Sequence, residues 1–266
     1  MTLTWTLWLT GWVGLCVGSF LNVVIHRLPQ ALQDEPPQQP LGLVHPRSRC
    51  PQCHTPLRAV HLVPVLSWLW LRRRCAFCGH AISPRYPLIE IGTALLWLAC
   101  AWRWGVTTEG LAWALCGSTL LALAVIDWET TWLPDRLTLP LLWAGLLWSA
   151  HDGAHLAPAQ AIWGAALGYL SLWAVAGLFE RLTGKVGMGG GDFKLLAALG
   201  AWLGPWALLP LVLLASLSGT VVGLVMQHRQ TLRAGGYLPF GPFLAAAGMA
   251  LAFAGDEATR WLFVSP

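Results

Sequence analysis

Charged side chains are scarce in this sequence. They make up 11% of the 266 residues, whereas 56% of the residues are hydrophobic. The apolar residues also occur in runs that are too long for the core helices of a soluble domain, so the composition excludes an ordinary soluble globular protein. No basic residue precedes the first apolar run, and no small-residue cleavage signal follows it. We therefore expect this run to be a retained membrane span of a multispan protein, not a removed signal peptide.

Two other patterns are missing. The isoelectric point of about 8.8 and the formal charge of +4 would suit an acidic partner, but aromatic and basic residues are not interleaved and no helix-turn-helix pattern is present. We expect no nucleic-acid partner. No internal repeat recurs at a fixed spacing, which argues against a repeat architecture.

The apolar runs between polar breaks predict an all-α polytopic membrane protein with about eight transmembrane helices. Two of these runs are short, covering ~21 Å and ~16 Å at 1.5 Å per residue against a hydrocarbon core of ~30 Å. Their true ends could extend into the loops, or the helices could dip into the bilayer. The eight predicted spans are residues 5–25, 87–102, 110–127, 137–150, 160–180, 194–204, 205–226 and 239–254, of which the fourth and the sixth are the short ones.

The positions of the basic residues predict the orientation. If the N-terminus lies outside, all of the 16 basic residues except Arg103 and Arg260 fall on one side of the membrane. The positive-inside rule identifies that side as the cytoplasm. Gly204 and Pro205 could form a hairpin between two spans or a kink within one. A single span would place Arg229 and Arg233 outside, so we favour two.

Paired cysteines mark a polar insert at residues 27–86, between the first and second spans. The pairs are Cys50 with Cys53 and Cys75 with Cys78, separated by 21 residues. Two such pairs can supply four thiolates in tetrahedral geometry and so bind structural zinc, with no open position for catalysis. Redox-active pairs or disulfides are the alternative, which a reducing cytoplasm disfavours.

Several other residues of the insert and the spans receive plainer interpretations. His54 and His80 flank the cysteine pairs and could replace a ligand, although an exposed position or a place behind the ligands is favoured for both. The remaining thiols lie in predicted spans and are expected to be small buried hydrophobes. They are Cys16, Cys100 and Cys116. The stretch Gln30 to Pro40, rich in Gln and Pro, is expected to be a flexible lead-in.

Asp127 and Asp192 are the candidate catalytic residues. Asp192 directly follows the run Gly187-Met-Gly-Gly-Gly191, whose lack of side-chain bulk would let another backbone approach. Two predicted spans separate the two acids, and an even number of crossings returns the chain to the same side. Two carboxylates held together could share a proton and divide acid and base work. The alternative is an interfacial helix-end carboxylate at Asp127 and a helix N-cap at Asp192.

Three further charged residues deserve separate expectations. Asp135 follows a proline and precedes a span, which favours a helix N-cap beside Arg136. Glu90 lies just inside the second span and could line a polar cavity. Lys194 could neutralise charge near the paired acids or extend to the membrane interface.

These motifs together resemble the type IV prepilin peptidases, aspartic proteases of bacterial inner membranes. The resemblance covers nearly the whole chain and rests on six motifs in order. They are Gly18-Ser-Phe-Leu-Asn-Val-Val-Ile-His-Arg-Leu-Pro29, the paired cysteines, Ser83-Pro-Arg-Tyr-Pro-Leu-Ile-Glu90, Asp127 with Leu133-Pro-Asp135, Gly189-Gly-Gly-Asp-Phe-Lys194 and Pro239-Phe-Gly-Pro242.

The resemblance implies catalytic roles for Asp127 and Asp192 and a zinc tetrad of Cys50, Cys53, Cys75 and Cys78. It implies a multi-pass protein of the bacterial inner membrane that cuts the leader from prepilins or pseudopilins at the cytoplasmic face. It also implies N-methylation of the new terminus with S-adenosylmethionine, although no glycine-rich loop follows a strand as in a Rossmann-type methyltransferase. The chain departs from the family at His61 to Ser67, where a polar residue and Asn commonly precede Ile-Pro-Val-Leu-Ser.

On this interpretation the chain has a first span at 1–26, the zinc-binding insert at 27–86 and a peptidase core at 87–266. Two other functions remain open at the level of the sequence. The first is a transporter or channel whose intramembrane acids line an ion path. The second is a methyltransferase without proteolysis. The separation of the two carboxyl groups distinguishes a dyad from an ion path, because a dyad must share a water.

Overall fold

The computed structural model describes residues 2–32, 42–43, 46–152, 154–231 and 238–255. Within these ranges every regular secondary-structure element is a helix. The β-pairing there consists of two isolated bridges. The expected flexible lead-in lies mostly outside the described residues, and its first part is wrong, because Gln30 and Ala31 still belong to a helix. The chain divides into two compact units, residues 1–118 and 119–266.

Each of the eight predicted spans coincides with a helix. Four helical segments are long and apolar enough to cross a membrane, namely Trp5–Ala31, Thr108–Thr130, Pro158–Thr183 and Pro205–His228. That the other four cross as well stays a prediction. The helices are α1 (Thr2–Ala31), α3 (Arg85–Trp104), α4 (Thr108–Thr130), α5 (Asp135–Ser149), α6 (Pro158–Thr183), α7 (Gly190–Leu203), α8 (Leu208–His228) and α9 (Gly241–Ala254).

In the first unit, α1 packs closely against α3. Gly14 and Gly18 lie one turn apart on α1, and a Cβ on either would come within 2.7 Å of a Cα of α3, that of Ala94 or Glu90 respectively. Small residues four apart are a common means of bringing two membrane helices together. The Asn22 side chain donates a hydrogen bond of 3.1 Å to the carbonyl of Tyr86 and so links α1 to the first turn of α3.

Between α1 and α3 the described part of the insert contains little regular structure. It has a 3-10 turn, η1 (Ala59–Leu62), and a short helix, α2 (Leu66–Trp70). Two β-bridges, Arg49 with Pro56 and Arg74 with Ala81, each close a small loop around one cysteine pair. The fold of this insert therefore depends on its turns and on the interaction that holds the four cysteines together.

In the second unit, α7 is the central helix. Every residue from Leu195 to Trp202 is buried, although α7 has only 14 residues. Gly164 of α6 and Gly200 of α7 face each other so closely that a Cβ on either would collide with the other's carbonyl. On another side, the Trp202 indole donates to the Leu141 carbonyl of α5 at 2.9 Å. α7 is thus enclosed by its neighbours.

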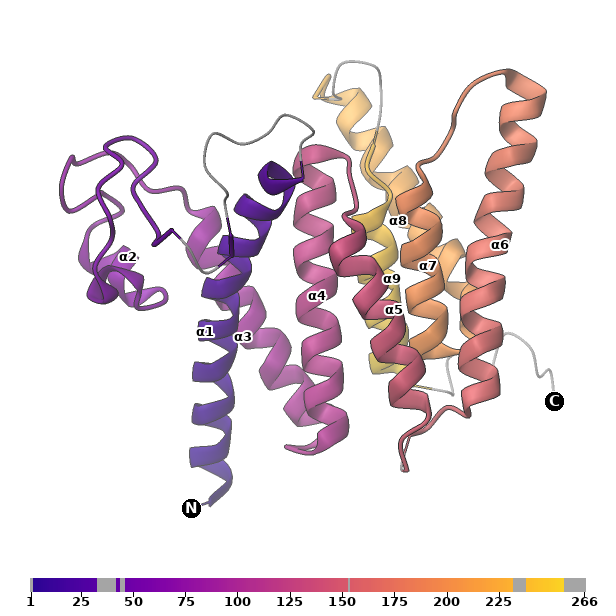
Figure 1. Cartoon of the computed structure of the whole chain (residues 1–266), viewed down its shortest axis with the longest axis horizontal. Helices are drawn as coiled ribbons and strands as arrows, with labels where there is room; N and C mark the ends of the chain where they lie inside the picture. Colours follow the sequence, from indigo (N-terminus) through magenta and orange to yellow (C-terminus); the bar gives the residue numbers. More distant parts are fainter. Residues whose placement is uncertain (1, 33–41, 44–45, 153, 232–237, 256–266) are drawn as a thin grey trace. The chain divides into compact units, whose positions relative to one another are not determined.

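The helices of this unit alternate in direction (Figure 1). α5 runs away from the end where α4 finishes, α6 returns, and α7 starts at that same end. Gly204, at φ 82°, separates α7 from a short turn, η2 (Pro205–Ala207), and α8 then runs back. The hairpin is therefore observed at Gly204, and the end of α4 and the start of α7 lie at one end of the unit.

Candidate active site and metal centre

Asp127 lies near the C-terminal end of α4 and is buried, with 5% of its surface exposed. Its Oδ2 accepts a hydrogen bond of 2.9 Å from the backbone N–H of Gly241. Gly241 is the first residue of α9, and a Cβ there would lie 2.7 Å from the same carboxylate oxygen. Asp127 does lie at a helix end, as the alternative supposed, but it is a buried carboxylate fixed by the start of α9.

Asp192 lies in the first turn of α7, outside the four candidate spans. The N-cap of this helix is Gly189, and the Asp192 N–H donates to the Gly189 carbonyl at 3.2 Å, so the N-cap alternative for Asp192 is also wrong. The Asp192 Oδ1 atom is buried and accepts no hydrogen bond within the described part of the chain. Burial, followed by the negative charge of Asp127, raises the pKa of the Asp192 carboxyl to about 7.

The two acids therefore form one electrostatic unit. They come from α4 and α7, and the charge of Asp127 raises the proton affinity of Asp192 because like charges in a poorly solvated place resist joint ionisation. A carboxyl with a pKa near neutrality can exchange protons at physiological pH. The arrangement thus has the chemistry of an acid and base pair.

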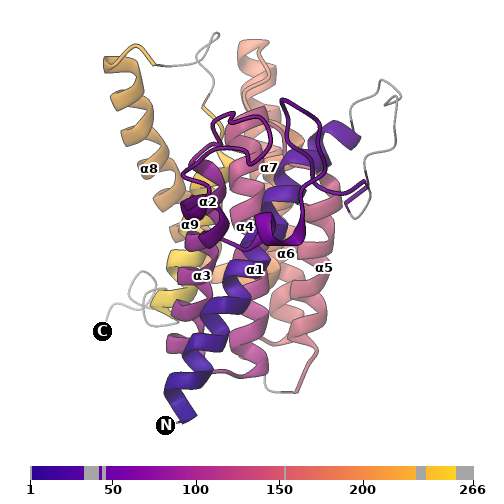
Figure 2. The ribbon, with the colours of Figure 1, turned by 90° about the vertical axis from the view of Figure 1, so that its left-hand side faces the viewer.

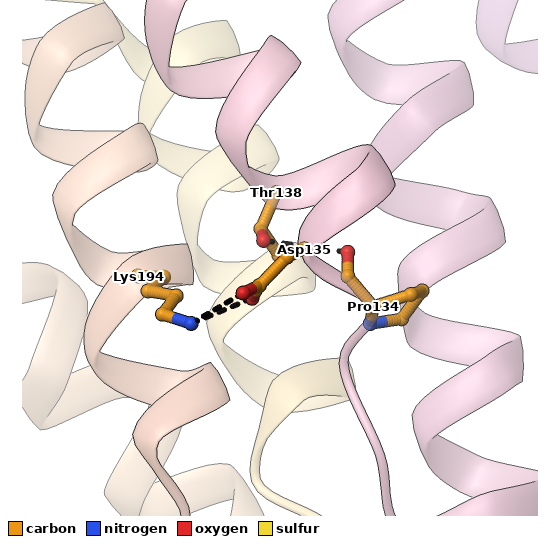
Figure 3. Close-up of polar contacts among 4 residues, drawn as sticks. All are labelled: Pro134, Asp135, Thr138 and Lys194. Carbon is orange, nitrogen blue, oxygen red and sulfur yellow. Dashed lines mark hydrogen bonds and ion pairs between the residues drawn. The ribbon is translucent and has the colours of Figure 1, made fainter. Parts of the chain in front are cut away.

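Lys194 and Asp135 form an ion pair between α7 and α5. The Lys194 Nζ lies 2.7 Å from both carboxylate oxygens of Asp135, as Figure 3 shows. Asp135 is the first residue of α5 and the N-cap is Pro134, so the expected N-cap role of Asp135 is wrong. Lys194 binds Asp135 and thereby joins the starts of α5 and α7. Neither of the two expectations for Lys194 had included this ion pair.

Only part of the glycine run is explained by packing. A Cβ on Gly191 would lie 2.8 Å from that of Leu133, and one on Gly187 would meet the ring of Phe179 at 2.8 Å. A Cβ on Gly189 or Gly190 would meet no atom of the described residues within 4 Å. The side of the loop next to Asp192 is thus open, as expected for a place where another backbone approaches.

The four cysteines of the insert converge. The Sγ atoms of Cys50, Cys53, Cys75 and Cys78 all lie within 4.8 Å of one another, with Cys50 and Cys78 at 3.7 Å. At a Zn–S distance of about 2.3 Å, two sulfurs of a tetrahedron are about 3.8 Å apart. All four thiols are free, which disfavours the disulfide alternative. The cluster fits a tetrahedral metal ion.

The two loops that carry these cysteines repeat the same hydrogen bonds. The Cys50 N–H donates to the Thr55 carbonyl at 3.1 Å, and the Cys75 N–H donates to the His80 carbonyl at 2.8 Å. Hydrogen bonds from Thr55 lower the pKa of the Cys53 thiol to about 6. Against a hydrogen bond from His80 that lowers it, burial and the neighbouring thiols raise the pKa of the Cys78 thiol to about 12, so the four sulfurs do not ionise independently. His80 and His54 are exposed and take part in the loops through their backbones.

Glu90 has a different role from the acidic pair. It is buried on α3, and its Oε2 accepts a hydrogen bond of 2.7 Å from the N–H of Val65, directly before α2. Glu90 thus ties the insert to α3, and this contact is the role that the structure gives to it. Among the thiols outside the cluster, Cys100 and Cys116 are buried as expected, whereas Cys16 is exposed on α1 and that expectation is wrong.

Comparisons with known proteins agree with this architecture. Residues 12–104 match the Bacterial Peptidase A24 N-terminal domain, and residues 114–224 match the Type IV leader peptidase family. A relative from Stutzerimonas stutzeri, named prepilin leader peptidase/N-methyltransferase, is 47% identical over 93% of this chain and 90% of its own length. The chain belongs to the type IV leader peptidase family.

Other relatives in this family carry the same name. The protein of Pseudomonas aeruginosa is 46% identical over 93% of this chain and 90% of its own length. That of Neisseria gonorrhoeae is 40% identical over 96% of this chain and 93% of its own length. No solved structure matches the chain. The resemblance inferred from the motifs is confirmed.

One residue of the site had no role in the sequence reasoning. Gly241 belongs to the motif Pro239-Phe-Gly-Pro242, yet nothing in that motif names Asp127 as the partner of its N–H. The available signal was the pair Gly241-Pro242, because proline favours the first turn of a helix, and the first-turn N–H groups of a helix lack intrahelical partners and can bind an acid.

Proposed function

We propose that this chain is a membrane-embedded aspartic endopeptidase with Asp127 and Asp192 as its catalytic pair. Its substrates are type IV prepilins or pseudopilins, and it removes their leader peptides. The observation that carries the proposal is the placement of two acids at one end of the second unit: Asp127 is buried and bound by the Gly241 N–H, and the partly buried Asp192 lies close enough for the charge of Asp127 to raise its pKa. The relatives, which are named prepilin leader peptidases, supply the substrate class.

The chemistry follows from two carboxyls that share one proton. The ionised member takes a proton from a water molecule, whose oxygen attacks the carbonyl carbon of the scissile peptide. The protonated member first polarises that carbonyl and then delivers a proton to the leaving nitrogen as the C–N bond breaks. One water is consumed, and the pair ends with one proton, as it began.

The surroundings of each acid support this division of work. The Gly241 N–H fixes the orientation of Asp127 through Oδ2. The unpaired Oδ1 of Asp192 is left with capacity to bind a water or a substrate carbonyl. Gly189 and Gly190 leave open space beside it, where an extended substrate backbone fits. An ion path would not need the charge of one acid to raise the pKa of the other, so this electrostatic influence of Asp127 on Asp192 favours proteolysis over transport.

The cellular placement is also part of the proposal. Apart from Arg103 and Arg260, the basic residues fall on one side in the predicted topology, which the positive-inside rule assigns to the cytoplasm. The active site then faces the cytoplasm from the bacterial inner membrane. A substrate with an apolar helix in the same bilayer would present its leader at that surface.

Two further features belong to the proposed function. The relatives are named N-methyltransferases as well, so we infer a second activity that methylates the new N-terminus with S-adenosylmethionine. The four cysteines would hold a zinc ion with four thiolates, which stabilises the insert and leaves no coordination position for water.

Replacement of the two acids tests the catalytic role. We expect Asp127→Asn and Asp192→Asn each to lower the rate of leader removal by at least about 100-fold, because either change removes the shared proton chemistry. The measurement is cleavage of a purified prepilin by the variant in detergent or vesicles. Asp152→Asn is the matched control, since Asp152 is an exposed acid in the loop between α5 and α6 of the same unit. Normal cleavage by either dyad variant would contradict the proposal.

A further inference from the structure

The short helix α2 carries an apolar face that points away from the protein. Leu66, Leu69 and Trp70 are spaced i, i+3 and i+4, so they share one side of the helix. Their exposed fractions are 55%, 57% and 78%. On the other side, the Trp68 indole donates to the Ile82 carbonyl at 3.3 Å and holds the helix to the insert. The exposed face is therefore displayed by an anchored helix.

Three arginines follow this face directly. Arg72, Arg73 and Arg74 are all exposed, and the Arg73 guanidinium lies 5.9 Å from the centre of the Trp68 ring. Arg72 and Arg73 adopt φ values of 48° and 63°. Glycine would adopt such a backbone at lower cost, so the turn itself does not account for arginine at these positions.

A hydrogen bond between α2 and α3 fixes the position of α2 along the length of α3. The Val65 N–H, at the N-cap of α2, binds Glu90, which lies more than one turn inside α3. At this level α3 already exposes an apolar stripe of Leu88, Ile91 and Leu95. Figures 1 and 2 show α2 beside the length of α1, not beyond its end. The apolar face of α2 thus lies level with an apolar stripe that suits lipid.

We propose that the face formed by Leu66, Leu69, Trp70 and Arg72 to Arg74 docks on the anionic phospholipid surface of the adjacent leaflet. Trp and Leu suit the boundary between headgroups and acyl chains, and arginines beside them attract anionic headgroups. Because α1 and α3 tether the insert at both ends, even a small face is presented at high effective concentration. This inference does not depend on the catalytic role of the acids.

Photo-crosslinking of the full chain tests the occupant. The photoreactive residue p-benzoylphenylalanine replaces Trp70, with the same replacement at Phe77 as the matched control, because Phe77 is exposed on the insert and packs edge-on against His61. The protein is placed in nanodiscs of phosphatidylcholine alone or mixed with phosphatidylglycerol. We expect phospholipid adducts at position 70, with more of them when phosphatidylglycerol is present, and few at position 77.

Charge removal tests the lipid preference. Arg72→Gln with Arg74→Gln should reduce the dependence of the position-70 adducts on phosphatidylglycerol by on the order of tenfold. Arg47→Gln with Arg49→Gln removes the same charge elsewhere on the insert and should leave it unchanged. Hydrogen exchange around Cys50 and Cys75 reports whether each variant keeps its fold. The proposal would be overturned if position 70 formed no lipid adducts and instead crosslinked to this chain, to a second copy or to an added prepilin. Equal amounts of lipid adduct at positions 70 and 77 would overturn it as well.

Discussion

At the scale of single residues, the site depends on two carboxyls that are held differently. Asp127 is bound by the N–H of Gly241, whereas the Oδ1 of Asp192 has no protein partner in the described residues. The same carboxyl bears the effect of burial and of its neighbour's charge. The pair is thus asymmetric before any substrate arrives, and Asp192 is the member whose proton affinity is matched to neutral pH.

This asymmetry predicts a pH dependence of stability. The pKa of Asp192 is raised from 3.8 to about 7 in the folded chain, so the folded state binds the proton more tightly than the unfolded state. The contribution of Asp192 to the free energy of unfolding is then greatest below the pKa that this carboxyl has in the unfolded chain, and it is lost as pH rises through about 7. We expect Asp192→Asn to remove this fall and to be the more stable protein, by a few kcal/mol, at high pH.

Thermal unfolding in detergent from about pH 5 to about pH 9 measures the effect. The difference in unfolding temperature between Asp192→Asn and the wild type should grow as pH rises. The control is Asp152→Asn, a change at an exposed acid in the same unit. It should change the unfolding temperature by the same amount at low and at high pH. A constant difference for Asp192→Asn would show that its ionisation is not linked to folding.

What the sequence could predict at this scale depended on distance along the chain. Asp127 and Asp192 were identified because each is an acid at the end of an apolar run, a local signal. The bond from Gly241 to Asp127 joins residues 114 apart, and the ion pair of Lys194 with Asp135 joins residues 59 apart. Both contacts arise from helix packing, so the sequence does not show which residue pairs with which.

At the scale of elements, the cysteine loops were predictable because their geometry is local. Each pair sits in a loop that backbone hydrogen bonds close within ten residues, so the geometry of the two sulfurs is set locally. The short helix α2 was not predicted, because the apolar run that contains it is too short to indicate a helix. Its N-cap, Val65, has φ 60° and depends on Glu90 of another element.

The insert should depend on metal for its fold. We expect about one zinc per chain, lost in Cys50→Ser and Cys75→Ser, because a tetrahedral site with three thiolates and one hydroxyl binds zinc much more weakly. Elemental analysis of the purified protein measures the metal. Cys16→Ser, at an exposed thiol of α1 outside the cluster, is the matched control and should retain zinc. A metal-free wild type with a folded insert would contradict the assignment.

At the scale of the whole molecule, the apolar runs predicted the existence of every main helix and the hairpin at Gly204. Helix lengths were harder to predict, because polar residues near the membrane do not mark where a helix ends. α5, for example, begins at Asp135 and has 15 residues, about 22 Å at 1.5 Å per residue, which is less than a hydrocarbon core of about 30 Å.

The topology gives a decisive test of whether α5 crosses. If α5 and α6 both cross, Asp152 between them lies outside while Lys185 after α6 lies in the cytoplasm. In intact spheroplasts a membrane-impermeant maleimide should then label Asp152→Cys at once and Lys185→Cys only after permeabilisation. The chain without an introduced cysteine is the control, because it reports labelling of the native thiols.

The opposite result would have consequences for the site. If α5 failed to cross while α6 did, Asp127 and Asp192 would lie on opposite sides of the membrane. That placement is incompatible with the effect of one carboxyl on the other and with the alternation of α5, α6 and α7. Labelling of Asp152→Cys from outside would therefore support both the short helix as a span and a catalytic pair at one membrane surface.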